Sequence, residues 1–225
     1  MIVTEVEHKV LDFVFLGVHM LSLCKPSVER CAEMLRCSKA SKLSYAFPGS
    51  IERGETPSGF NRDRARCLLG SGVEVWSAAV ESFRRWRFMP KRVLEVIPPE
   101  AVECDQVVGI LFRGLGVWSA NPARIIRVHD FEDRNGRSFG FTYATLPGHV
   151  EQGEERFLLT WKQESDEVWY KLDAVSRPNH VLAWIAYPYA RWQQAKFRRD
   201  SCASMKNSVD ELLAAAKDQK IGLGV

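Results

Sequence analysis

The middle of the chain carries six short β-rich segments separated by turn residues, and this feature restricts the possible folds most. The segments span residues 92–97, 107–113, 122–131, 138–146, 154–163 and 167–176. The polar turns at 133–136 and 164–167 are too short to contain a crossover helix, so the strands on either side must pair antiparallel. The sequence therefore predicts an antiparallel sheet.

A long helix with one apolar side is predicted after the last strand. Asn179 can cap it, Pro188 is expected to kink it, and its apolar positions recur at helical spacing to about Lys217. The predicted inner stripe is Val181, Trp184, Ile185, Tyr189, Trp192, Met205, Val209, Leu212 and Leu213. Because the sheet and the helix would each expose an apolar face alone, the helix must cover the sheet. The expected fold class is α+β, a curved antiparallel sheet gripping a long C-terminal helix (helix-grip).

Two shorter helices are predicted upstream of the strands. Ser27 is a suitable N-cap for a helix over 28–35, and a second helix over 73–88 is expected to end at Pro90. Residues 46–63 are rich in Pro, Gly, Ser and charge, which indicates a surface loop.

The length of 225 residues suits a single domain. We expect an N-terminal extension packed on the domain at 1–44, the helix-grip domain itself at 45–217 and a flexible tail at 218–225. The apolar run at 10–24 is too short to span a bilayer, and the pattern around it is not that of a secretory signal.

Composition argues against several classes of protein. The formal net charge is +3, and no DNA- or RNA-binding motif is present, so no nucleic-acid partner is expected. The six cysteines show neither paired CxxC spacing nor a disulfide framework, which favours reduced thiols in the cytoplasm. Neither a metal site nor a cofactor is predicted.

Four motifs are similar to those of a known family: 114–121 (GLGVWSAN), 139–151 (FGFTYATLPGHVE), 153–157 (GEERF) and 176–178 (SRP). With 69–72 and Trp86 they resemble the family called domain of unknown function nineteen-ninety, over roughly residues 45–205. No activity comes with this resemblance. The family is in turn similar to the Bet v 1 and START ligand-binding group, which implies a helix-grip fold around a small molecule.

The loop at 147–154 carries the candidate catalytic residues His149, Glu151 and Glu154. A His–carboxylate pair can act as a general base near neutral pH. The alternative is that His149 forms a hydrogen bond with a neighbouring carboxylate and merely holds the hairpin.

Strand alternation predicts which side chains point inward. Arg124 shares a face with Ile126 and Val128, and Glu155 shares a face with Phe157 and Leu159. Inward charges are too costly to leave unpaired, so we expect Arg124 and Glu155 to meet or to line a polar pocket.

Four further residues are candidates for ligand binding. Tyr143 and Thr145 can offer hydroxyl groups to a ligand or satisfy cross-strand hydrogen bonds. Ser176 is expected to face the same interior, and Trp184 lies on the predicted inner stripe of the helix.

The helix also carries a basic run at Lys196, Arg198 and Arg199. Such a run can contact phosphate or an anionic membrane surface, so peripheral membrane contact is possible without a transmembrane segment. The alternative is a solvated helix face.

Three functions fit these observations. The first is a binding protein that encloses a hydrophobic small molecule, lipid-like or aromatic, in an apolar cavity under the C-terminal helix. The second is an enzyme, such as a hydrolase, cyclase or isomerase, that uses the His149–carboxylate pair. The third is a protein-interaction module, which an interior packed solid with side chains would favour.

Overall fold

The computed structural model describes residues 20–90, 94–97, 102–179 and 184–222. The elements within these residues are β1 (Met20–Ser22), α1 (Val28–Ser38), α2 (Ser50–Arg53), β2 (Asn61–Ser71), α3 (Val73–Arg84), β3 (Leu94–Ile97), β4 (Val107–Gly114), β5 (Val117–Asp133), β6 (Gly136–Thr145), β7 (Glu151–Lys162), β8 (Glu167–Pro178) and α5 (Tyr187–Gly222).

All the strands belong to one antiparallel sheet. Its order is β2-β8-β7-β6-β5-β4-β3, and β1 adds to β5. The strands that are consecutive in sequence from β3 to β8 are neighbours in the sheet, as the short turns require. The long strand β5 connects the β3–β4 side of the sheet to the β6–β7–β8–β2 side. It pairs with β4 near its start and with β6 along the rest of its length.

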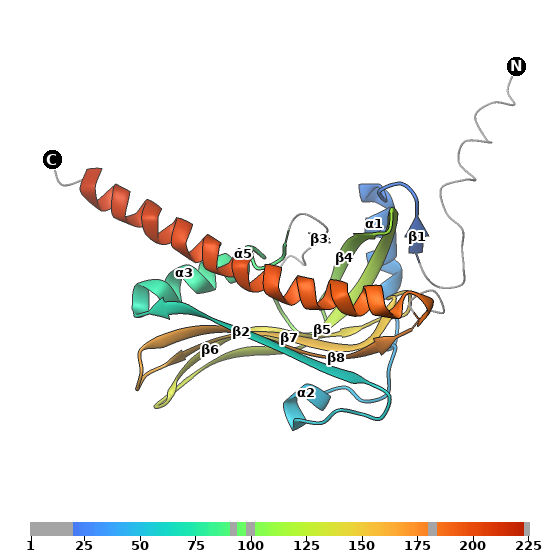
Figure 1. The fold of residues 1–225 in the computed structure, drawn as a ribbon, viewed down its shortest axis with the longest axis horizontal. Helices are drawn as coiled ribbons and strands as arrows, with labels where there is room; N and C mark the ends of the chain where they lie inside the picture. Colours follow the sequence, from blue (N-terminus) through green and yellow to red (C-terminus); the bar gives the residue numbers. More distant parts are fainter. Residues whose placement is uncertain (1–19, 91–93, 98–101, 180–183, 223–225) are drawn as a thin grey trace, which may run out of the picture.

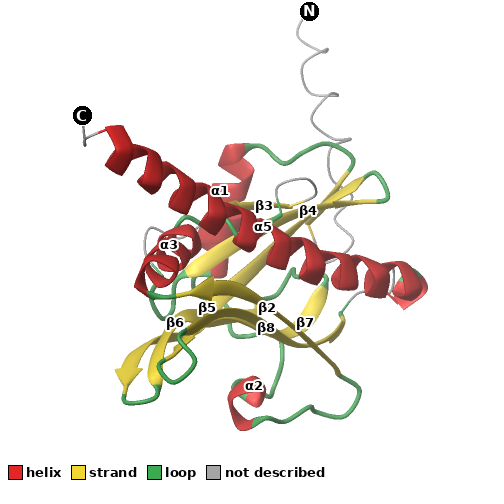
Figure 2. Cartoon of the chain, turned by 60° about the vertical axis from the view of Figure 1, so that its left-hand side comes forward, coloured by secondary structure: helices red, strands yellow, loops and turns green. Residues whose placement is uncertain are grey.

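Two helices cover the concave face of this curved sheet. The long helix α5 runs across it, with α3 beside it at one end, whereas the short helix α2 lies on the opposite, convex face (Figures 1 and 2). The predicted α+β helix-grip fold is thus confirmed.

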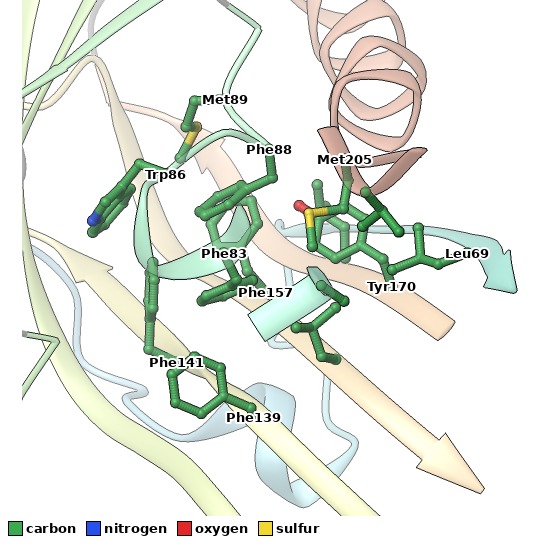
Figure 3. Close-up of a cluster of buried hydrophobic side chains, with 14 of the residues drawn as sticks. Leu69, Phe83, Trp86, Phe88, Met89, Phe139, Phe141, Phe157, Tyr170 and Met205 are labelled. Atoms are coloured by element: carbon green, nitrogen blue, oxygen red, sulfur yellow. The ribbon is translucent and has the colours of Figure 1, made fainter. Parts of the chain in front are cut away.

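An aromatic core fills the concave face beside α3 (Figure 3). The Phe83 and Phe88 rings stack with centroids 4.7 Å apart, and Phe83 meets Phe141 edge-on at 5.5 Å. Met205 and Val209 of α5 are fully buried against this core. Burial of one such side chain contributes about 1.5–3 kcal/mol, so this end of α5 is firmly attached to the sheet.

The end of α3 differs from the predicted helix over 73–88. The helix ends at Arg84, and Trp86 adopts a positive φ of 55°. The chain therefore reverses before Pro90, which lets Phe88 and Met89 enter the core.

The first described residues pack on the outer side of the sheet. Ser27 caps α1 as predicted, because its hydroxyl accepts a hydrogen bond from the Arg30 amide. Cys31 and Met34 of α1 form a second, smaller core with Leu111 and Ala120. The apolar run at 10–24 falls mostly outside the described residues.

Two predictions about the outer elements were wrong. Residues 61–71 form strand β2 at the edge of the sheet, although their first part was assigned to a loop. The C-terminal helix, predicted to end at about Lys217, continues to Gly222.

The start of the C-terminal helix agrees with the prediction only in part. Residues 184–185 are helical and a turn at Ala186 separates them from α5, so the helix is interrupted as predicted; Pro188 itself lies in the first turn of α5, where its missing amide costs nothing. Trp184, Ile185 and Trp192 are 56%, 73% and 54% exposed, and so do not belong to the inner stripe. Val181, also placed on that stripe, lies outside the described residues.

Candidate functional site

A cavity of about 260 Å³ lies between the concave face of the sheet and the first half of α5. Its lining includes most of the residues predicted from the sequence: Tyr143, Thr145, His149, Glu151, Glu154, Glu155 and Ser176. Apolar side chains form much of the remaining wall, namely Met89, Ile110, Phe112, Val150, Ala174 and Phe197. Arg124 and Trp184 are not part of this lining.

The sequence of α5 explains why the space stays open at this end. The side chains that α5 places over the cavity include Ala190, Gln193 and Gln194, which are small or polar. Farther along, Met205 and Val209 fill the corresponding space against α3. The two halves of α5 thus differ: the second packs on the core, and the first lies over the cavity.

A single row of side chains crosses the concave face below the cavity. Tyr143, Glu155, Ala174 and Asp63 are cross-strand neighbours on β6, β7, β8 and β2. The Tyr143 hydroxyl donates a 2.6 Å hydrogen bond to Glu155 Oε2. Removal from water raises the pKa of Glu155 to about 7, although the Tyr143 hydrogen bond opposes the shift.

Glu151 faces the cavity from the start of β7. Its carboxylate accepts a hydrogen bond from the Gln194 side-chain amide of α5. Burial raises the pKa of Glu151, against the opposing effects of its hydrogen bonds to Ser176 and Gln194. Glu151 thus links the sheet to the helix across the cavity.

Asp63 was not identified from the sequence, and its carboxylate pairs with two arginines of α5. Arg191 holds it with two hydrogen bonds of 2.5 and 2.8 Å, and Arg198 lies 3.2 Å away. The sequence did contain a signal for β2. Arg62, Arg64 and Arg66 alternate with smaller residues, a pattern typical of a strand with one face toward solvent.

His149 adopts a position that limits its use as a base. Its Nδ1 accepts a hydrogen bond of 3.0 Å from the Glu151 amide, and Asn179 binds its carbonyl oxygen. With Nδ1 occupied, the neutral ring carries its proton on Nε2. His149 therefore helps to hold the loop through a hydrogen bond to a backbone amide.

Glu154 and Thr145 contribute to the cavity lining, but their polar atoms are already hydrogen-bonded to the 44–51 segment. The Glu154 carboxylate is 2% exposed and accepts hydrogen bonds from the Gly49 and Ile51 amides. The Thr145 hydroxyl lies 2.5 Å from the Ser44 hydroxyl and accepts a bond from the Gly153 amide. Both side chains fix the 44–51 segment to the sheet.

Arg124 does not meet Glu155. Instead, its guanidinium donates hydrogen bonds to the Ser38 and Lys39 carbonyls at 3.2 and 2.8 Å. The pairing of β5 with β6 skips Ile126, and this bulge reverses the alternation, so Arg124 points to the convex face. Trp184, the other candidate outside the cavity, stacks on Tyr187 at the surface.

The basic run on α5 is largely neutralised. Lys196 pairs with Asp200, and Arg198 pairs with Asp63. These pairs leave Arg199 as the exposed member of the run. None of the helices in the described part of the chain is long and apolar enough to cross a membrane.

These observations define the protein as a helix-grip domain with a partly polar cavity under its C-terminal helix. A model of the family described as domain of unknown function (DUF1990) matches residues 44–204, so the chain belongs to this family. Its relatives include a UPF0548 protein of Dictyostelium discoideum, 32% identical over 173 residues, which covers 73% of this chain and 80% of the relative. A UPF0548 protein of Deinococcus radiodurans is 31% identical over 187 residues, covering 78% of this chain and 88% of the relative.

Similar solved structures are more distant. The crystal structure of Ara h 8.0201 has a TM-score of 0.42 at 9% identity and covers 68% of this chain and 99% of that one. The crystal structure of TTHA0849 from Thermus thermophilus has a TM-score of 0.44 at 14% identity, covering 69% and 99%. The fold assignment itself rests on the strand order and on the placement of α5.

Proposed function

We propose that this protein binds a small hydrophobic molecule, aromatic or lipid-like, in the cavity beneath the first half of α5. The observation that carries the proposal is the cavity itself, about 260 Å³ of space walled by apolar side chains with a few polar groups at one side. A mostly apolar concave site with few polar groups is the usual form of a ligand pocket.

The cavity volume limits the size of the ligand. A dry protein cavity of about 150 Å³ holds benzene, whereas drug-sized ligands occupy pockets of about 300–1,000 Å³. A volume of about 260 Å³ therefore suits a molecule of one or two rings, or a short-chain lipid.

The geometry supports binding better than the two alternatives. An interaction module would not need an interior space of this size. As a general base, His149 would have to release the Glu151 amide first, and Glu154 is occupied by two backbone amides. Catalysis by this group of residues stays a prediction that a variant can test.

We also place this binding function in the cytoplasm. The cysteines are all unpaired, and three of them, Cys24, Cys37 and Cys104, are exposed. Exposed free thiols suit a reducing compartment.

A neutral fluorescent probe with two fused rings, 6-propionyl-2-(dimethylamino)naphthalene, tests the proposal. It should bind the full-length protein saturably with increased emission, because the cavity wall is largely apolar. Ala174→Phe fills the cavity from β8 and should abolish binding while the protein stays folded, whereas the control Ala203→Phe places the same ring on the exposed side of α5. If both variants bound the probe with equal affinity, the probe would have to bind outside the cavity, and the proposal would be contradicted.

A further inference from the structure

We propose that the ligand of this cavity carries a positively charged amine, and that Glu155 and Glu151 bind it. This inference rests on the function proposed above and specifies the polar end of the ligand. Glu155 accepts a hydrogen bond from the Tyr143 hydroxyl, and Glu151 accepts one from the Gln194 amide. Both donors are neutral, and within the described ranges neither carboxylate forms an ion pair.

The nearby cations are already bound to other carboxylates. Arg191 and Arg198 both contact Asp63, and Lys196 pairs with Asp200. Three carboxyl groups, those of Asp63, Glu151 and Glu155, thus adjoin two guanidinium groups on this side of the cavity. One negative charge has no counter-charge when all three are ionised.

An unmatched charge in a site removed from water must be neutralised by a proton or by a cation. In the empty site a proton does this, since burial and the neighbouring Glu151 both raise the pKa of Glu155. An ammonium group bound between the two glutamates would replace that proton and restore the balance. A carboxylate ligand would add a second unmatched charge.

The surroundings favour an organic amine over a metal ion. An ammonium group has three N–H donors, enough to bond the carboxylates of Glu151 and Glu155 together. The apolar wall formed by Met89, Phe112 and Phe197 would enclose the body of the ligand. In the part of the chain that the structure describes, no group of three or more His, Cys, Asp or Glu side chains could hold a metal ion.

Three probes with the same two-ring body test this inference: 1-naphthylmethylamine, 1-naphthylmethanol and 1-naphthoic acid, which are cationic, neutral and anionic. Isothermal titration calorimetry on the full-length protein at pH 8 should show the amine binding at least about tenfold more tightly than the alcohol, because its bonds to carboxylate are charge-assisted. The acid should bind most weakly. At pH 5.5 the preference for the amine should shrink, because Glu155 is then mostly protonated.

Proton release gives an independent readout. At pH 6.5, repeated titrations in buffers of different ionisation enthalpy should show that the amine expels part of a proton from Glu155, whereas the alcohol expels none. A preference that arose from shape alone would show no such difference between the two probes.

Variants connect the preference to the glutamates. Glu155→Gln should lower the affinity for the amine about tenfold and leave the affinity for the alcohol unchanged, while the exposed control Glu103→Gln should change neither. Equal affinities for amine and alcohol, or an amine affinity that Glu155→Gln leaves intact, would overturn this inference but not the proposed function. Failure of all three probes to bind would contradict both.

Discussion

The raised pKa of Glu155 predicts that Glu155→Gln stabilises the protein at alkaline pH. Glutamine has the shape of the protonated side chain and keeps an oxygen that can accept the Tyr143 hydrogen bond. If Arg124 and Glu155 were paired, as expected from the sequence, the substitution would have the opposite effect. It would leave the buried charge of Arg124 without a partner and lower the stability.

The magnitude follows from the shift in pKa. A rise from 4.5 to about 7 corresponds to a cost of about 3 to 4 kcal/mol for ionising Glu155 in the folded state, at about 1.4 kcal/mol per pH unit. The folded state binds the proton more tightly, so this cost is absent below pH 4.5, grows between pH 4.5 and 7, and is complete above pH 7. The wild type should therefore lose this stability as the pH rises, and Glu155→Gln should not.

Urea denaturation of the wild type and of Glu155→Gln at pH 4.5 and pH 8 measures this difference. The free energies of unfolding should agree to within about 0.5 kcal/mol at pH 4.5, and the variant should be about 3 to 4 kcal/mol more stable at pH 8. The exposed control Glu103→Gln should show no such dependence on pH. A variant less stable than the wild type at pH 8 would refute the environment assigned to Glu155.

Three further substitutions test how the site is held. Met205→Ala removes a fully buried side chain that attaches α5 to the core. Urea denaturation should show a free energy of unfolding lower by about 2–5 kcal/mol. An unchanged free energy of unfolding would mean that α5 is not packed on the sheet at Met205. Glu154→Ala leaves the Gly49 and Ile51 amides without their carboxylate acceptor, so it should lower the free energy of unfolding by about 2–4 kcal/mol and leave probe binding intact. Loss of probe binding without loss of stability would instead show that Glu154 contacts the ligand. His149→Ala should cost about 1 kcal/mol for its hydrogen bond to the Glu151 amide, with little change in affinity. A hundredfold loss of turnover on an identified substrate, without loss of stability, would restore the catalytic role of His149.

Strand alternation predicted the concave side chains of β6, β7 and β8 correctly. The pairing of these three strands runs without a bulge from Tyr143 to Glu155 and Ala174, so the period of two holds along them. It failed on β5, where the skipped Ile126 turns Arg124 to the other face. A bulge is a feature of two paired strands, and neither strand's sequence reveals it alone.

The cavity and its charges depend on contacts that local patterns do not encode. Asp63 comes from β2 and its partners Arg191 and Arg198 from α5, more than a hundred residues later. Helical periodicity indicated a one-sided helix, and it was right for Met205 and Val209. It could not show that Trp192 would remain half-exposed, because that depends on where the first half of α5 stands away from the sheet.

Native mass spectrometry of the full-length protein tests the central claim, a ligand cavity under α5, most directly. After addition of 1-naphthylmethanol, we expect a one-to-one complex for the wild type and for Ala203→Phe, and the mass of the polypeptide alone for Ala174→Phe, whose added ring fills the cavity. An unliganded mass for all three proteins, or a complex that persists in Ala174→Phe, would contradict it.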